Sequence, residues 1–346
     1  MCALMVANPF MQFGSETLAT IRKDFYLPER KLYGEERTVE KPAGQVAFNW
    51  GVGVMLSALN SAARSDAKYE PWLREYADAT RVYWNPAGPV PGFDVLPTPK
   101  PVDRYYDDNA WMVMSLVETY EVLKDRKYLD SAREALAYVL SGRDDTLGGG
   151  IYWRESDKAS KNTCANAPAV AAAMAVYEHT KDPSLLQVSK DVYDWTKKTL
   201  QDPEDKLMWD AINLNGEIGK MKWTYNTGLM IRAAKALYQV TKEGRYLEDA
   251  REMERASLKH WLPENGKSGA RCEGKFAHLM FEGWAFAPAF EEGLKARDEA
   301  LRFVYEKAKD PNGRYGNRWE RPAEGAREKF SLIDQASAAR AFFEAA

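Results

Sequence analysis

Apolar residues recur every three or four positions over most of the chain, and polar residues fill the positions between them. This is the period of an amphipathic helix with one buried face. One clear run contains Leu129, Ala132, Leu136 and Val139. Segments that alternate apolar and polar residues, as half-buried strands do, reach no convincing length. The pattern therefore predicts an all-α protein.

One phrase recurs along the chain: YEVLKDRKYLDSA begins at Tyr120, YEHTKDPSLLQVS at Tyr177 and YQVTKEGRYLEDA at Tyr238. The starts lie 57 and 61 residues apart, and a looser copy covers residues 60–77. Each unit consists of a helix rich in small residues, a short polar turn and a second, amphipathic helix. A period near 34, typical of tetratricopeptide repeats, is absent. The repeats therefore predict helix pairs of about 60 residues.

The first helix of each pair is more apolar than the second, as residues 169–177 and 229–238 illustrate. The second helices carry most of the Lys, Glu and Arg residues. Helices expected at about 286–309 and at 332–343 extend the series to about six pairs. Closing such a series into a ring buries the apolar helices on all sides. We therefore expect a single domain over residues 1–346, an all-α (α/α)6 toroid with inner and outer helices.

Composition and charge exclude several classes of protein. The chain has 48 Lys and Arg against 51 Asp and Glu, so no basic excess is available for nucleic acid or an anionic membrane. Three cysteines lie far apart, and the three histidines have no HExxH spacing. We therefore expect neither a metal nor an organic cofactor. The longest small apolar run, residues 165–177, is too short to span a bilayer.

The first ten residues, MCALMVANPF, lack the basic region of a signal peptide. The protein is then either cytoplasmic or a mature or trimmed form. A monomer is the default expectation for its oligomeric state.

The segments that enter the predicted inner helices are rich in aromatic and amide side chains. They read VAFNWGVGVM, YYDDNAWMVM, KNTCANAPAV and WTYNTGLMIR; all four contain Asn and three contain Trp. In a toroid these segments converge at one end, where rings can stack on pyranose faces and amides can bind hydroxyls. Helix capping by Asn and Asp is the alternative explanation. The candidate substrate-binding residues are Asn49, Trp50, Tyr106, Trp111, Tyr152, Trp153, Lys161, Asn162, Asn166, Trp223, Tyr225 and Asn226.

The adjacent carboxylates of Asp107 and Asp108 are the candidate catalytic residues. Two such charges repel each other, so one should keep its proton to a higher pH than the other. Glycoside hydrolysis uses this division between acid and base. Neighbouring Cα atoms are about 3.8 Å apart, so a carboxyl separation near 5 Å, typical of a retaining mechanism, is within reach. A helix cap is the alternative, and the residues do not show which aspartate has which role.

A second acidic pair, Asp144 and Asp145, precedes the glycine-rich sequence GGGIYW. It follows an outer helix and has no aromatic residue on its N-terminal side. We interpret this pair as part of a loop.

The phrases DDNAW, GGGIYW, KNTCAN and WTYNTG, in this order, resemble the signatures of glycoside hydrolase family 76. The resemblance covers residues 48–261 well and the last third weakly. It implies an (α/α)6 toroid that cleaves the α-1,6-mannan backbone with retention, acts outside the cytoplasm, and uses Asp107 as nucleophile and Asp108 as acid and base. The chain departs from the family pattern at Cys164, where an apolar residue is common, and at Asn109, where Gln is common.

Two alternatives to this endo-α-1,6-mannanase remain open. One is another sugar enzyme of the same fold, an unsaturated glucuronyl hydrolase or an epimerase. An epimerase would need histidines near the mouths of the inner helices, and only His278 has a suitable position. The other is a toroid that binds carbohydrate without turnover.

Overall fold

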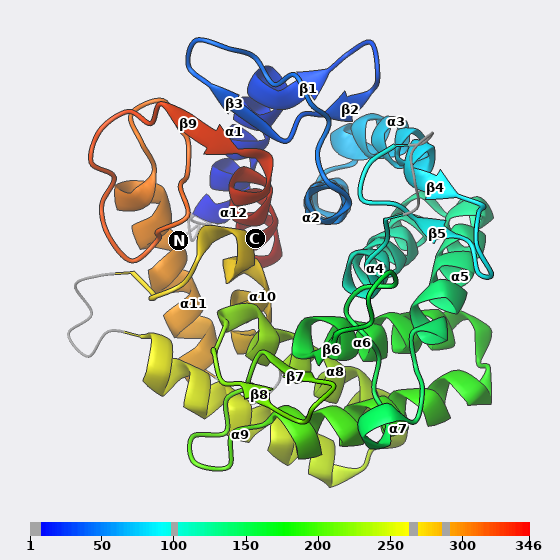
Figure 1. Cartoon of the computed structure of the whole chain (residues 1–346). Coiled ribbons are helices and arrows are strands. Elements are labelled where there is room, and N and C mark those ends of the chain that lie inside the picture. Colours follow the sequence, from blue (N-terminus) through cyan, green and yellow to red (C-terminus); the bar gives the residue numbers. More distant parts are fainter. Residues whose placement is uncertain (1–7, 98–102, 263–268, 286–290) are drawn as a thin grey trace, which may run out of the picture.

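The computed structural model describes residues 8–97, 103–262, 269–285 and 291–346, and within them most residues are helical (Figure 1). The inner helices are α2 (Asn49–Ser65), α4 (Tyr106–Leu123), α6 (Thr163–Thr180), α8 (Thr224–Thr241), α10 (Gly274–Trp284) and α12 (Leu332–Ala345). The outer helices are α1 (Pro9–Phe25), α3 (Glu70–Ala79), α5 (Arg126–Ser141), α7 (Pro183–Leu200), α9 (Gly244–Trp261) and α11 (Glu291–Phe303). Each inner helix packs on the next, and α12 packs on α2. The predicted toroid is confirmed.

The two ends of the chain meet and close the ring. Helix α1 is the outer partner of α12, the last inner helix. The Asn8 side-chain amide donates hydrogen bonds of 3.0 and 2.8 Å to the carbonyl oxygens of Ala345 and Ala346. The repeat analysis did not predict this pairing, because it joins segments more than 300 residues apart.

The repeated sequence phrase forms the turn between an inner and an outer helix. Lys124, Lys181 and Lys242 each end an inner helix with a φ between 56 and 59°. Each donates its backbone N–H to the carbonyl oxygen of the tyrosine four residues earlier, at 2.8–2.9 Å. The side chains of Asp125 and Asp182 then cap the next helix. This tight turn explains why the phrase recurs with each helix pair.

The connections at the opposite end are much longer and carry the short strands. The antiparallel pairs are β1 (Tyr26–Leu27) with β2 (Leu32–Tyr33), β3 (Glu36–Thr38) with β9 (Lys329–Ser331), and β4 (Trp84–Asn85) with β5 (Gly92–Phe93). A three-stranded antiparallel sheet has β7 (Ala211–Asn213) between β6 (Ser160–Asn162) and β8 (Ile218–Gly219). One short 3-10 turn, Ala67–Tyr69, lies between α2 and α3 at the other end, and two more cover Thr80–Tyr83 and Thr146–Gly148 at this end. Long loops on a rigid scaffold are where function concentrates, so this end is the candidate functional face.

The structure refines one expected helix and places the longest small apolar run of the sequence. The helix expected at about 286–309 is α11, continued by a π-helical turn at Val304–Ala308. Residues 286–290 lie outside the described part of the chain. The apolar run at 165–177 lies in α6 and is almost entirely buried between other helices. Among the helices that the structure describes, none is long and apolar enough to cross a bilayer.

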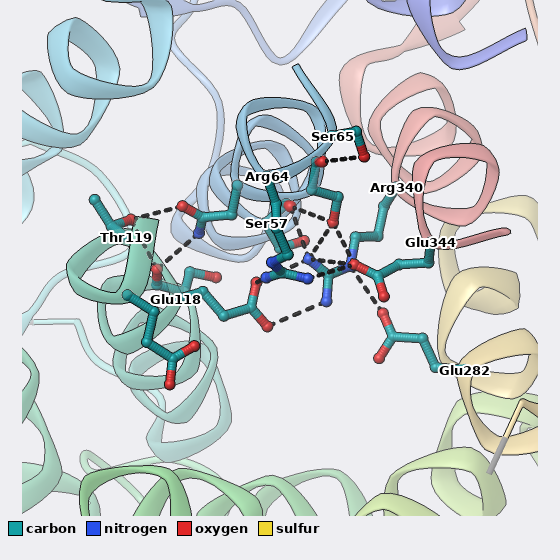
Figure 2. Close-up of polar contacts among 12 residues, drawn as sticks. Ser57, Arg64, Ser65, Glu118, Thr119, Glu282, Arg340 and Glu344 are labelled. Carbon is teal, nitrogen blue, oxygen red and sulfur yellow. Dashed lines mark hydrogen bonds and ion pairs between the residues drawn. The ribbon is translucent and has the colours of Figure 1, made fainter. Parts of the chain in front are cut away.

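A network of ion pairs lies at the end of the ring opposite the long loops (Figure 2). It borders a cavity of about 460 Å³ that the C-terminal parts of all six inner helices line. The buried Arg340 guanidinium donates to Glu282 at 2.9 Å and to Glu118 at 2.8 and 3.1 Å. Arg232 bonds to the same two glutamates at 3.2 Å. These contacts join α4, α8, α10 and α12.

Helix α2 joins the same network through its backbone and the side chains of Ser61 and Arg64. Arg340 donates to the Ser57 carbonyl oxygen at 2.9 Å, and Arg64 pairs with Glu344 at 3.0 Å. Burial by itself would raise the pKa of Glu344, but Arg340 and Arg64 lower it to about 2. The cations and carboxylates thus neutralise one another where the inner helices converge. His278, buried in α10, also lines this cavity.

Candidate active site

Asp107 and Asp108 are the second and third residues of α4, at the end of the ring that carries the long loops. The Trp153 indole nitrogen donates to Asp107 Oδ2 at 3.0 Å, and the backbone N–H of Asp108 donates to Asp107 Oδ1 at 3.0 Å. Both side chains are partly accessible. The helix N-terminus also favours negative charge at these positions.

The two carboxylates have different protonation behaviour. Burial raises the pKa of Asp107 to about 6, against the lowering effect of the bonds from Trp153 and the Asp108 backbone. Burial raises the pKa of Asp108 well above its usual value, and the charges of Asp107 and Asp103 raise it further. Asp108 therefore keeps its proton to a higher pH than Asp107, and each titration depends on the other because the two carboxyl groups are adjacent.

The second residues of the six inner helices form a ring around this mouth. In order around the toroid they are Trp50, Asp107, Cys164, Tyr225, Lys275 and Ile333. Burial raises the pKa of the Cys164 thiol well above its usual value, and the nearby Asp107 carboxylate raises it further. Residues about 60 positions apart in the sequence are therefore neighbours, because equivalent helix starts converge here.

Aromatic rings continue from this group around the mouth. Tyr225 stacks on Phe276 with ring centroids 4.1 Å apart, and Phe276 stacks on Trp50 at 5.3 Å. Trp223 also contacts Phe276, at 5.8 Å. Trp50, Trp223 and Tyr225 were candidates from the sequence, and they lie together. Phe276 was missed, because α10 lies outside the recurring phrase.

Trp153 lies beside Asp107 and belongs to the loop between α5 and α6. It is 39% exposed, and its ring packs edge-on against Tyr105 with centroids 5.0 Å apart. The Tyr106 backbone N–H donates to the Trp153 carbonyl oxygen at 2.9 Å, so the loop that carries Trp153 is attached to the start of α4. Tyr105, which precedes α4, was missed as a candidate, and the sequence predicted Tyr106 in its place.

Tyr106 and Trp111 are not positioned as surface contacts for a ligand. The Tyr106 ring is buried and stacks on Tyr138 of α5, with centroids 4.9 Å apart. It therefore points to the outer ring of helices. Trp111 is buried one helical turn below Asp107, with its ring 5.8 Å from that of His278. Both rings pack against other side chains of the protein, and their direct contact with substrate stays a prediction.

Asn166 has a structural role that its sequence position did not reveal. Its amide accepts from the Ile151 backbone N–H at 2.7 Å and donates to the Ile151 carbonyl oxygen at 2.9 Å. Asn109 makes the same pair of bonds to Phe93, at 2.8 and 2.9 Å. Both asparagines are fully buried. Asn166 therefore attaches a loop to an inner helix, and its expected role in binding hydroxyl groups stays a prediction.

Lys161 is likewise a loop anchor. Its buried ammonium group donates to Asp144 Oδ1 at 2.7 Å and to the carbonyl oxygens of Thr146 and Gly149 at 2.8 and 2.7 Å. The buried Tyr152 donates its hydroxyl to Asp144 at 2.8 Å. Lys161 and Tyr152 therefore hold the glycine-rich loop, and their contact with substrate stays a prediction. Asp144 takes part in this loop, which fits the interpretation of that acidic pair.

The remaining amide candidates are buried near the helix starts. Asn162 accepts a hydrogen bond of 2.6 Å from the Ser160 hydroxyl. Both amide atoms of the fully buried Asn49 lack a hydrogen-bond partner among the described residues. Asn226 is buried beside Asp210, a carboxylate that the sequence analysis did not identify. No cluster of three metal-ligating side chains occurs within the described ranges.

His278 does not lie at the mouth. Its Nδ1 lies 2.9 Å from the Ser337 hydroxyl, and burial lowers its pKa to about 3. The ring is therefore neutral, and it borders the cavity at the opposite end of the toroid. This position removes the one histidine that favoured an epimerase.

Comparisons with known proteins agree with this geometry. A solved α-mannanase of family 76 from Bacteroides thetaiotaomicron is 31% identical, with 99% of this chain and 96% of that chain covered at a TM-score of 0.91. An inactive α-1,6-mannanase variant from Salegentibacter, solved with α-1,6-mannotriose, is 23% identical, with coverage of 97% and 98% and a TM-score of 0.83. It carries asparagine at two consecutive aspartate positions.

A mannan endo-1,6-α-mannosidase of Candida glabrata is 27% identical over an alignment of 106 residues. The match covers 28% of this chain and 24% of that protein. The match therefore spans about a quarter of that relative. The model of glycosyl hydrolase family 76 matches residues 15–325. This protein therefore belongs to glycosyl hydrolase family 76 and is a glycoside hydrolase.

Proposed function

We propose that the protein is a retaining endo-α-1,6-mannanase, with Asp107 as nucleophile and Asp108 as general acid and base. The single observation that carries the assignment is the asymmetry of the pair. Asp107 receives two hydrogen bonds that stabilise its charged form. No donor in the described part of the chain is bonded to the Asp108 carboxyl group, which favours its protonated form. The inactive relative, altered at two consecutive aspartates, supports the choice of this pair.

The reaction would proceed in two displacements. In the first, an Asp107 oxygen attacks the anomeric carbon of a mannosyl unit, and the bond to the leaving oxygen breaks as Asp108 protonates it. In the second, Asp108 removes a proton from water, the water oxygen attacks the same carbon, and the bond to Asp107 breaks. Two inversions give net retention, so the new reducing end is the α anomer.

The aromatic groups around the mouth support a carbohydrate chain as substrate. Trp153 presents an exposed ring beside Asp107, Trp50 lies on the neighbouring helix α2, and Trp223 and Tyr225 lie at the start of α8. The last three are partly exposed. Flat rings of this kind bind the apolar faces of pyranoses. The printed names of two relatives, an α-1,6-mannanase and a mannan endo-1,6-α-mannosidase, support α-1,6-mannan in particular. We propose that the enzyme acts on α-1,6-mannan as a monomer.

The test is incubation of the purified protein with unbranched α-1,6-mannan. The expected products are short oligosaccharides from internal cleavage, and NMR should detect the α anomer first at the new reducing ends. Release of the β anomer first would contradict retention. Binding without cleavage would contradict the enzyme assignment for this linkage.

The dependence of the rate on pH follows from the two carboxyl groups. Catalysis needs a charged Asp107, so kcat/KM should rise as the pH passes through about 6, the pKa of that group. It also needs a protonated Asp108, so the rate should fall at higher pH, above the raised pKa of Asp108. Initial rates measured from pH 4 upward should thus show an acidic limb near pH 6 and a fall once the pH exceeds the raised pKa of Asp108. A rate that falls steadily from pH 4 upward would contradict this assignment.

A further inference from the structure

Three inner helices carry an amide side chain at their fourth position, and each amide fastens a loop to its helix. It accepts a hydrogen bond from the backbone N–H of one loop residue and donates to the carbonyl oxygen of that same residue, at 2.7–2.9 Å. It also donates to the carbonyl oxygen of the residue before the helix, at 2.8–3.1 Å. All three amides are buried, and we call this arrangement an amide clasp. The clasps are Asn109 with Phe93, Asn166 with Ile151, and Gln335 with Tyr315.

The clasp of Asn166 lies where the glycine-rich loop ends. Residues 148–150 are three glycines, all with positive φ values that glycine adopts far more readily than other residues. Ile151 follows them and is fully buried. Both N–H protons of the Asn166 amide are used, one for Ile151 and one for Asn162. The clasp therefore fixes the position at which an adaptable stretch of backbone gives way to an ordered one.

A short path leads from this clasp to the candidate nucleophile. Trp153 is two residues beyond Ile151, and its backbone N–H donates to the Ser160 carbonyl oxygen at 3.0 Å. Its indole nitrogen donates to Asp107 Oδ2 at 3.0 Å. The contacts thus connect Asn166 of α6 to Asp107 of α4 through the loop between them.

The clasp of Gln335 holds a different loop. Tyr315 lies between α11 and α12, and its buried ring packs on Phe342 of α12 with centroids 5.9 Å apart. The same set of hydrogen bonds therefore occurs at one helix start that carries Trp153 to Asp107 and at another that does not.

We propose that Asn166 is a positioning residue for Asp107 and acts through Ile151 and Trp153. Its clasp holds the loop in the place from which the indole N–H reaches Asp107 Oδ2. A donor at this oxygen stabilises the charged carboxylate, so a weaker bond should raise the pKa of Asp107. This inference rests on the proposed function, in which Asp107 is the nucleophile.

The other charged and titratable groups near Asp107 come from the start of α4, from two loops packed on it, and from the starts of α6 and α8. The thiol and the phenols among them are neutral, because burial raises the pKa of each. Substitution of Asn166 changes none of these groups, so a shifted titration of Asp107 reports on the indole contact. The groups are Asp103, Tyr105, Asp108, Arg154, Cys164 and Tyr225.

An NMR measurement tests this contact without any substrate, so its result does not depend on the proposed function. The indole N–H signal of Trp153 is identified by its disappearance in Trp153→Phe. In the wild-type protein this signal should change near pH 6, as Asp107 titrates. In Asn166→Ala it should move upfield, as expected when a hydrogen bond to a carboxylate weakens, and its titration should move to higher pH.

Gln335→Ala is the matched control, because it removes the same three hydrogen bonds from the same helix position. It should lower the thermal stability about as much as Asn166→Ala does, yet leave the Trp153 signal unchanged. Asn166→Thr is a milder variant for the case that Asn166→Ala does not fold. Thr227, at the fourth position of α8, accepts from the Met208 backbone N–H at 3.1 Å, so threonine is able to keep one bond of a clasp.

The kinetic test uses α-1,6-mannan. In Asn166→Ala the acidic limb of kcat/KM should move upward by roughly half a unit to one pH unit, and kcat should fall roughly tenfold. The acidic limb of the double variant with Trp153→Phe should coincide with that of Trp153→Phe alone, because both changes act on one hydrogen bond. Gln335→Ala should keep the acidic limb of the wild-type protein.

A Trp153 signal that stays in place when Asn166 is substituted would overturn the proposal. So would an equal change of that signal in Gln335→Ala, because it would indicate a general loosening of the fold. A wild-type protein that shows the expected NMR changes but does not cleave α-1,6-mannan would overturn only the mannanase assignment.

Discussion

Asp107→Asn and Asp108→Asn should each lower turnover of α-1,6-mannan by roughly a thousandfold or more, because each removes one participant of both displacements. Neither change should disturb the fold greatly, since asparagine keeps the size of the side chain and both side chains are partly accessible. Initial rates and thermal unfolding, measured on the same preparations, provide the check.

The two variants should also differ from each other. Asp108→Asn leaves the nucleophile intact, so a substrate with a good leaving group, which needs no protonation, should still form the glycosyl-enzyme. External azide should then accelerate turnover of that substrate by Asp108→Asn but not by Asp107→Asn. Retained activity with a large loss of stability would mean that the pair serves only to cap α4.

Arg340→Met should have the largest expected effect on stability, a loss of about 3–5 kcal/mol in the free energy of unfolding. The change removes a buried guanidinium group. It leaves Glu118 and Glu282 with fewer partners at the end of the ring opposite the long loops. Methionine keeps much of the length of the side chain, so the loss reports chiefly on charge. Urea or guanidinium titration measures it.

Arg126→Met is the matched control, because Arg126 pairs with Asp130 on the exposed surface of α5. An exposed pair of this spacing contributes only about 0.3–0.5 kcal/mol. Adding Glu118→Gln to Arg340→Met should recover part of the loss, since it removes one of the unpaired charges. An Arg340→Met protein as stable as the control variant would show that the network is not important for stability.

Much of the architecture follows from local sequence patterns. The tyrosine–lysine–acid phrase marks the turn at the end of three inner helices, where the backbone adopts the left-handed conformation, and in two of these turns an aspartate caps the next helix. The difference in polarity between the helices of each pair predicted the inner and outer rings. The pairing of α1 with α12 was not predictable in this way, because a contact between the chain ends has no local pattern.

The candidate site was predicted only in part. The segments before the inner helices do converge, and they bring together Asp107, Trp153, Trp50, Trp223 and Tyr225. The sequence could not separate these residues from the loop anchors, because Asn, Lys and Tyr serve both purposes. Tyr105 and Tyr106 are neighbours, yet one faces Trp153 and the other packs on the outer ring.

The sequence by itself determined the repeat, the helix pairs, the acidic pair at the start of one helix and the family resemblance, since all of these reside in residues close together along the chain. Only the tertiary structure decided that Asp107 receives two donors while Asp108 stays in a poorly solvated site. It also decided that Cys164 and Tyr225 lie near Asp107. Burial and contacts between distant segments set the pKa of a carboxyl group, and neither can be derived from the order of the residues alone.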